Sequence, residues 1–201
     1  MFMKKKLSFF SLVCLLAALL SCNDSASTKD AVEKADSANE KKLDSSTETP
    51  STTIANTIDQ ETADFMVKAA DGGMEEVQMG KVANEKAVSQ RVKNFGAMMV
   101  EDHSKANDEL KGLAAQKNVT LPKEMADEHK KDVENVQKKT GKNFDKEYIK
   151  MMVDDHQKDI DEFEKASKNT KDTDVKMWVD KTLPVLRKHL DSAKAINNSL
   201  K

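Results

Sequence analysis

The sequence is poor in the residues that build β-sheet proteins and in those that cross-link small domains. Its 201 residues include only two cysteines, three prolines and six glycines, and aromatic residues make up 4%. Helix-favouring residues such as Ala, Lys, Glu and Met are abundant instead, which predicts an all-α protein. Removal of an N-terminal segment containing Cys14 would leave Cys22 alone, so no disulfide is expected within the mature chain.

An excess of positive charge is also missing. The chain has 33 Lys and Arg against 35 Asp and Glu, a formal net charge of −2, and no basic run beyond Lys4 to Lys6. Nucleic-acid-binding proteins carry a basic patch or stripe that neutralises phosphates. We therefore expect no nucleic acid partner.

The first 21 residues have the pattern of an export signal. Lys4 to Lys6 precede an uncharged apolar run, Leu7 to Leu20, whose 14 residues are fewer than the roughly 20 that a membrane-spanning helix needs. The run ends in Leu19-Leu20-Ser21-Cys22, which resembles the lipobox of bacterial lipoproteins. This resemblance implies lipidation of Cys22, a membrane partner through the lipid anchor, and a place in the bacterial cell envelope. Asn23 after the cysteine fits outer-membrane delivery; the alternative is a cleaved secretory peptide with an incidental cysteine.

Residues 22–58 have the composition of a disordered linker. They are rich in Ser, Thr, Asp, Lys and Glu and contain only four sizeable aliphatic residues. Such a segment buries too little apolar surface to offset the entropy lost on ordering. We expect a flexible tether between the lipid and a folded domain.

Residues 59–201 have the hydrophobic periodicity of α-helices. Apolar residues recur at spacings of three and four, and turn residues separate the periodic segments. We expect helices over about 60–84, 89–116, 122–139, 144–167 and 173–199. Gly141 is expected to end the third helix, and Pro184 to kink the last one or mark where it restarts. Five antiparallel helices with short loops predict a four-helix bundle with an additional helix.

An internal repeat suggests two related helical hairpins. Residues 98–110 and 151–163 are identical at eight of thirteen positions, and each contains the motif Met-Met-Val-acidic-Asp-His. We expect these hairpins to follow an extra first helix.

Several motifs resemble the bacterial domain-of-unknown-function family 4142, predicted outer-membrane proteins with a ferritin-like helical bundle. They are Ala69 to Val77, Val92 to Phe95, Met99 to His103, Met152 to His156, Lys181 to Pro184, and His189-Leu190. The resemblance spans about residues 60–197 and implies the ferritin-like fold and the envelope location.

Four histidines carry the candidate chemistry: His103, His129, His156 and His189. They fall on separate expected helices, and metal sites in bundles are built by side chains that project from facing helices. Glu76 on the first helix could add a carboxylate. The alternative is that each histidine is a core residue whose ring hydrogen-bonds to a nearby carboxylate or backbone carbonyl.

The residue types around the histidines restrict the metal chemistry. No Glu-x-x-His pair is present, which argues against the di-iron centre of ferritin-like enzymes. Methionine stands four residues before three histidines, at Met99, Met125 and Met152. A thioether and an imidazole on one helix face suit copper, above all Cu(I), although methionine is also a common core residue.

Two functions remain open from the sequence. The favoured one is a membrane-anchored, non-enzymatic envelope lipoprotein that acts as a binding or stress-related accessory module. No nucleophile or phosphate-loop motif is present to suggest an enzyme. The alternative is binding or sequestration of copper or another transition metal in the bundle core. Its candidate ligands are His103, His156, Met99 and Met152, with His129, His189 and Glu76 as further members.

Overall fold

The computed structural model describes residues 30–47 and 58–200, which are helical almost throughout and contain no β-strand. The helices are α1 (Ala31–Thr47), α2 (Gln60–Lys86), α3 (Gln90–Gln116), α4 (Asp127–Gln137), α5 (Gly141–Asn169) and α6 (Thr173–Ser199). The all-α prediction is confirmed. The expected signal segment and Cys22 lie outside the described residues.

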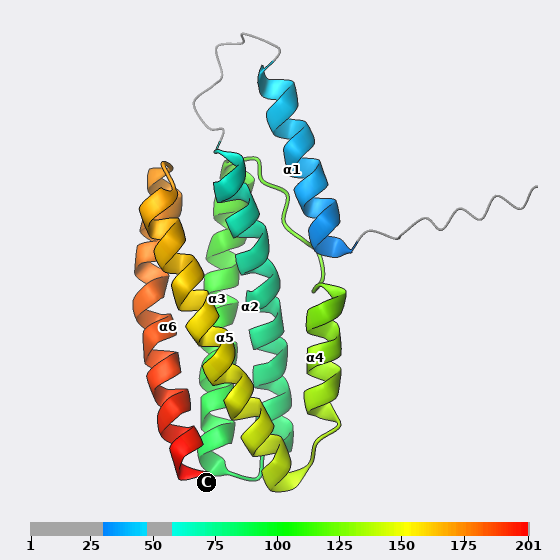
Figure 1. Cartoon of the computed structure of the whole chain (residues 1–201), viewed down its shortest axis with the longest axis vertical. Helices are drawn as coiled ribbons and strands as arrows, with labels where there is room; N and C mark the ends of the chain where they lie inside the picture. The colour runs from blue at the N-terminus through cyan, green and yellow to red at the C-terminus, as the bar shows by residue number, and fades with distance from the viewer. Residues whose placement is uncertain (1–29, 48–57, 201) are drawn as a thin grey trace, which may run out of the picture.

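Four long helices form the bundle (Figure 1). The α2–α3 hairpin packs against the α5–α6 hairpin, so that α2 and α6 each contact both α3 and α5. The additional helix is α4, in the connection between the hairpins, and not the first helix of the domain. The expected division into an extra first helix and two following hairpins is therefore wrong, because α3 pairs with α2 rather than with α4.

Short polar signals fix the helix ends. Asp59 caps α2 through the backbone N–H of Thr62, and Asp172 caps α6 through Asp174 and Val175. The α2–α3 loop is closed from a distance, since the carboxylate of Asp145 on α5 accepts hydrogen bonds from two of its backbone N–H groups. Gly141, with φ of 58°, begins α5 instead of ending α4, whose last residue is Gln137.

Two other expectations about helix ends need correction. Pro184 does not interrupt the last helix, which is continuous over Thr173–Ser199. A proline inside a helix removes one backbone donor, and packing of α6 against two neighbours compensates for this loss. The third expected helix is shorter than predicted, because residues 122–126 form an irregular approach to α4.

Small residues bring α2 and α3 into close contact. A Cβ atom added to Gly80 would lie 2.7 Å from the backbone oxygen of Gly96, and one added to Gly96 would lie 2.8 Å from the backbone oxygen of Gly80. Neither glycine can be enlarged without moving a helix backbone. This crossing holds the last third of α2 against the first third of α3.

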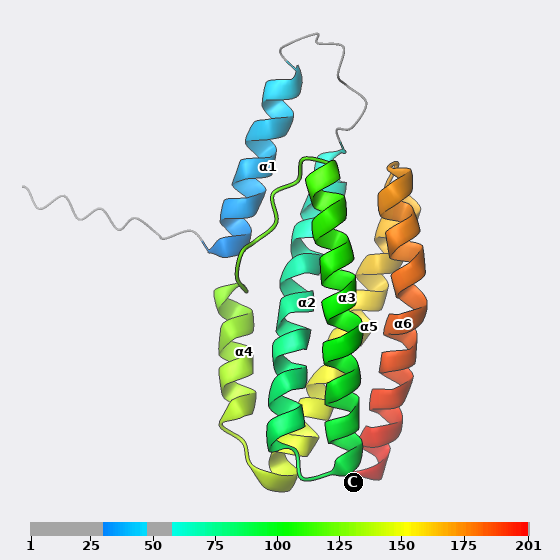
Figure 2. The same cartoon turned by 180° about the vertical axis from the view of Figure 1, so that it is seen from behind.

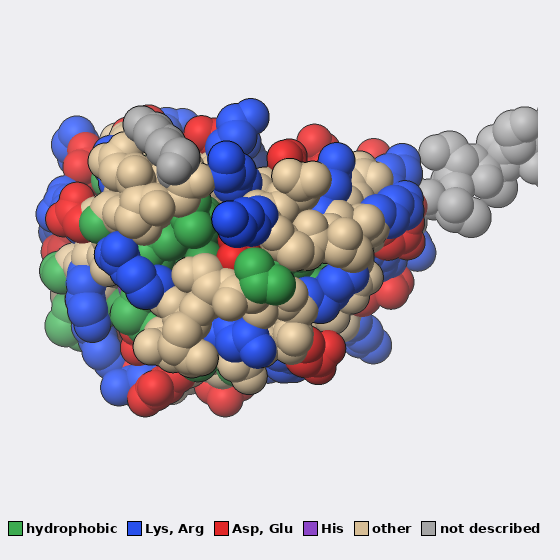
Figure 3. All heavy atoms as spheres, turned by 90° about the horizontal axis from the view of Figure 1, so that it is seen from below, with side chains coloured by type: hydrophobic (Ala, Val, Ile, Leu, Met, Phe, Trp, Pro, Cys, Tyr) green, Lys and Arg blue, Asp and Glu red, His purple; other side chains and the backbone are tan. Residues whose placement is uncertain are grey.

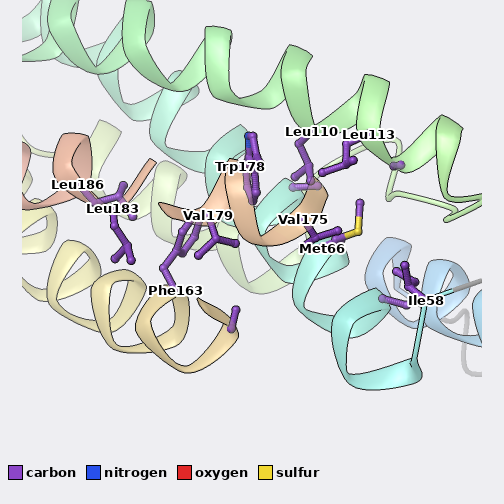
Figure 4. Packing of buried hydrophobic residues seen from close by; sticks show 14 of the residues in the cluster. Ile58, Met66, Leu110, Leu113, Phe163, Val175, Trp178, Val179, Leu183 and Leu186 are labelled. Atoms are coloured by element: carbon purple, nitrogen blue, oxygen red, sulfur yellow. The ribbon is translucent and has the colours of Figure 1, made fainter. Parts of the chain in front are cut away.

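Two hydrophobic clusters occupy the bundle interior. The first joins the start of α2 and α6 to the end of α3 and α5 and includes Met66, Leu110, Phe163 and Trp178 (Figure 4). The second lies toward the other end of the bundle and includes Phe95, Phe144, Tyr148 and Met152. Viewed from that other end, hydrophobic patches lie between charged side chains, and none of the described histidines is visible (Figure 3). Between the two clusters along the helices lies a buried polar layer.

The tether prediction is wrong for residues 31–47, which form helix α1. This helix runs beside α2, and α1 and α4 follow one another along that side of the bundle (Figure 1, Figure 2). Its buried face carries Ala35 and Asn39, and the Asn39 amide exchanges two hydrogen bonds with the backbone of Thr120. A small residue and a polar one make this contact, so a count of large aliphatic residues missed it. None of the described helices is apolar over a length sufficient to cross a bilayer.

Candidate metal site

Three histidines from three helices converge in the polar layer. His103 is on α3, His156 on α5 and His189 on α6, and all three are buried. Nδ1 of His189 lies 3.2 Å from Nε2 of His103 and 3.3 Å from Nε2 of His156. The sequence placed these residues on separate helices, and the fold brings them together.

The second nitrogen of each ring has its own acceptor. Nδ1 of His156 lies 3.0 Å from the backbone oxygen of Met152. Nε2 of His189 lies 2.9 Å from Oδ2 of Asp102, and Nδ1 of His103 lies 2.7 Å from Oε2 of Glu76.

These acceptors set the tautomers of the neutral rings. Each outer nitrogen carries the proton that it donates, so the three inner nitrogens are left with lone pairs that face one another. Metal-binding histidines show this arrangement, in which an outer acceptor fixes the ring and raises its basicity as a ligand.

The spacing of the inner nitrogens suits a metal ion. With metal–nitrogen bonds of about 2.0–2.1 Å, tetrahedral geometry places two ligand nitrogens about 3.3 Å apart. The two observed distances are 3.2 and 3.3 Å. The third pair, His103 and His156, lies within 4.8 Å, so an ion would draw these two rings toward the spacing of the other pairs.

Glu76 on α2, the remaining bundle helix, offers a candidate oxygen ligand. It is 5% exposed, and its Oε1 lies 3.5 Å from Nε2 of His156 and has no N–H donor. Its carboxyl also lies within hydrogen-bonding reach of the Asp159 carboxyl, so an ion that bound between them would displace the proton they share. Each of the four bundle helices thus carries a candidate ligand, although Glu76 groups with His156 and Asp159 rather than with all three histidines.

A second group of potential ligands overlaps the first. Glu76, His156 and Asp159 place one ligand atom each within 4.8 Å of one another, as do His103, His156 and His189. Asp159 follows His156 by one helical turn on α5. The sequence analysis missed Asp159, although its i, i+3 spacing from His156 predicts a shared helix face.

Burial controls the protonation of the site. It lowers the pKa of His103 and of His189 to about 4, and it lowers the pKa of His156 well below its ordinary value. Burial also raises the pKa of Glu76 to about 8. At neutral pH the three rings are therefore neutral and able to bind a metal, whereas the carboxyl of Glu76 holds a proton that an ion would displace.

His129 lies outside this cluster. It is near the start of α4, its side chain is 31% exposed, and its nitrogens lie 2.9 Å from Oδ2 of Asp71 and 3.3 Å from Oε2 of Glu75. The contact with Asp71 raises the pKa of His129 to about 9. Among the described residues, His129 joins no group of three potential ligands.

The methionines belong to the hydrophobic packing. Met99 and Met152 are fully buried in the second hydrophobic cluster, and Met152 meets His156 through its backbone oxygen. Met125 precedes α4, so it shares no helix face with His129. The ligand set supported by the described contacts is imidazole and carboxylate.

The fold and the site together define a class of protein: a four-helix bundle with one polar ligand from each helix at its centre. A family model described as "Domain of unknown function (DUF4142)" matches residues 47–196. The chain belongs to this family, as the sequence resemblance indicated. No curated protein matches the chain.

A solved structure shows the same fold. The crystal structure of a DUF305 fragment from Deinococcus radiodurans is similar, with a TM-score of 0.64 and 7% sequence identity. The similarity covers 71% of this chain and 99% of that chain. At this identity the comparison shows the bundle architecture alone.

Proposed function

We propose that this protein is a metal-binding module, which holds one divalent transition-metal ion between His103, His156, His189 and Glu76. The convergence of three imidazole nitrogens, each with an outer acceptor on the opposite nitrogen, carries this proposal. Core histidines that serve only packing need a partner for each polar atom. Here the inner lone pairs face one another, with only the distant Oε1 of Glu76 beside that of His156, and a cation would satisfy all three.

The donor set indicates the class of metal. Three imidazoles and a carboxylate are borderline to hard ligands, which suit Zn²⁺, Co²⁺, Ni²⁺ and Cu²⁺ better than Cu⁺. Copper as Cu⁺ was attractive from the methionine spacing, but Met99 and Met152 pack in a hydrophobic cluster.

The number of ligands favours binding over catalysis. Catalytic zinc sites keep three protein ligands and an open position, whereas closed sites use four. Glu76 is buried with one oxygen 3.5 Å from Nε2 of His156, and a shift of its side chain toward the three histidines would supply the fourth ligand. The function is therefore storage, sequestration or structural use of the ion rather than turnover.

Stoichiometric binding tests the proposal directly. Untagged protein with Cys14→Ser and Cys22→Ser, which removes competing thiols, is titrated with Zn²⁺ by calorimetry and with Co²⁺ by absorption. We expect one ion per chain and an increase in unfolding free energy of about 2.7 kcal/mol at an ion concentration 100 times Kd. His156→Ala should abolish binding, and His129→Gln should retain it. Absence of binding by the parent protein, or equal binding by both variants, would overturn the proposal.

The location is a second part of the proposal. We infer that Cys22 is lipidated and holds the domain at the bacterial outer membrane, as the run Leu19 to Cys22 indicates. Mass spectrometry of protein from bacterial membranes should find an acylated N-terminal Cys22. Cys22→Ser should release the protein from the membrane fraction. Membrane retention of this variant without acylation would contradict the anchor.

A further inference from the structure

A pocket of about 480 Å³ connects the surface to the buried ligands. It lies between α2, α4 and α5, with the start of α1 at its rim, and its lining includes Glu75, Glu76, His129 and Asp159. Glu76 and Asp159 also belong to the second group of potential metal ligands. The pocket therefore ends at side chains that face the metal site.

The pocket lining is strongly acidic. Nine carboxyl side chains contribute to it, against two lysines and His129. Burial raises the pKa of Glu75, Glu76 and Asp159, so the more exposed carboxylates carry most of the negative charge. Clefts lined by charge of one sign concentrate ions of the opposite sign and accelerate their association. This surface attracts cations toward the bundle centre.

An unpartnered oxygen in the pocket wall also points to a ligand. Glu75 is 5% exposed, and its Oε1 has no hydrogen-bond partner, whereas its Oε2 lies 3.3 Å from Nε2 of His129. Buried polar atoms without partners are rare and costly. A cation that passes along the wall would bind this oxygen.

The two overlapping ligand groups are successive positions for one ion. Nε2 of His156 faces both Oε1 of Glu76, at 3.5 Å, and Nδ1 of His189, at 3.3 Å. Its other ring nitrogen is occupied by the backbone of Met152. One nitrogen has one lone pair, so His156 can ligate a single ion, in either position but not in both at once.

Two other directions to the histidines are less suited to an entering cation. The two hydrophobic clusters fill the bundle on both sides of the polar layer along its length. Between α3 and α6, the Nε2–H of His189 donates to Asp102 and directs a proton, not a lone pair, toward solvent.

We propose that the cation enters through this acidic pocket and is held first by Glu76, His156 and Asp159, before it moves to the three histidines. This inference rests on the proposed function, because it concerns the route to the same site. Asp159 acts in loading, and the three histidines act in retention. Glu75 draws the ion inward from the pocket wall.

Binding kinetics separate the route from the site. Stopped-flow mixing of Co²⁺ with the cysteine-free full chain gives the association rate constant, and titration gives the stoichiometry. We expect Asp159→Asn to lower the association rate by about 10-fold, because it removes a carboxylate ligand from the first position. It should still bind one ion per chain. Asp154→Asn is the matched control, because it makes the same substitution at an exposed position on α5 outside the pocket, and its rate should not change.

A second variant covers a failure of Asp159→Asn to fold. Glu75→Gln alters the pocket wall without touching either ligand group, and it should also slow association while stoichiometry is kept. Parent-like association rates in the folded variants would overturn the route while the metal site stands. A lower affinity caused by faster dissociation, with an unchanged association rate, would also overturn the route. Asp159 would then be a ligand of the final site only. Failure of the parent chain to bind Co²⁺ would instead refute the proposed function.

Discussion

His189 and His129 each have an aspartate oxygen 2.9 Å from a ring nitrogen, yet the pKa of His189 is about 4 and that of His129 about 9. Burial dominates at His189, which is fully buried beside two other imidazoles. His129 keeps contact with solvent and has a second carboxylate, Glu75, at its other nitrogen. One residue type thus gives a neutral ring, a candidate metal ligand, in one place and a cation in an ion pair in the other.

Replacement of each histidine by alanine should give the largest difference in Zn²⁺ affinity between the sites of His189 and His129. His189→Ala should weaken Zn²⁺ binding by more than about 100-fold, because loss of even an outer-shell partner typically costs 10–100-fold. His129→Ala should leave affinity within a factor of about two, since His129 is outside the ligand set. Isothermal titration calorimetry checks both variants. A similar loss in both would mean that the four histidines form one site.

The aspartates that support the two histidines provide the next test. Asp102→Asn should lower Zn²⁺ affinity by about 10–100-fold, because it weakens the acceptor that holds the proton of His189 on the outer nitrogen. Asp71→Asn removes the corresponding charge at His129 and should not change affinity. Competition with a chelator of known affinity measures the difference. Equal affinities in the two variants would assign Asp102 a packing role only.

The pKa difference should itself depend on Asp71. In metal-free protein, NMR titration of the histidine rings should show His129 titrating near pH 9, with His103 and His189 neutral down to about pH 4. Asp71→Asn should lower the pKa of His129 toward its ordinary value near 6.5, because the contact with Asp71 is the main cause of the increase. His103 should not respond. An unshifted His129 would identify Glu75 as the controlling partner.

The smallest expected effect is on stability. The pKa of His129 is higher in the folded chain than the usual unfolded value, so its contribution is complete below about pH 6.5 and is lost as pH rises to about 9. His129→Gln should therefore reduce the free energy of unfolding by about 1 kcal/mol at pH 6, in the range of partly exposed ion pairs, and by almost nothing at pH 9.5. Urea unfolding of both proteins at the two pH values measures this. A constant difference would indicate a packing effect.

The helices that build the site were predictable from local sequence signals. The periodicity of apolar residues predicted α2, α3, α5 and α6 nearly to their ends, and the repeat placed His103 and His156 at equivalent points of α3 and α5. Pairing of helices was not predictable in this way. The wrong hairpins depended on the expected third helix. Its first residues are irregular in the structure, where the backbone N–H of Ala126 donates to Asp71.

The membership of the site depended on long-range packing. The sequence treated His129 as equal to the other histidines, because its spacing from neighbouring apolar residues was similar. In the fold, α4 is short and lies at the side of the bundle, so His129 faces the acidic side of α2 rather than the core. Glu76 was identified from the sequence as a possible carboxylate ligand, and it lies on α2 close to the crossing of Gly80 with Gly96.

The four candidate ligands are divided evenly between the hairpins, with Glu76 and His103 on one and His156 and His189 on the other. A bound ion would therefore act as a cross-link between the two halves of the bundle. Because the halves cannot separate until metal–ligand bonds break, the metal should slow unfolding. Resistance of the loaded protein to proteases would then be set by the lifetime of the ion in its site.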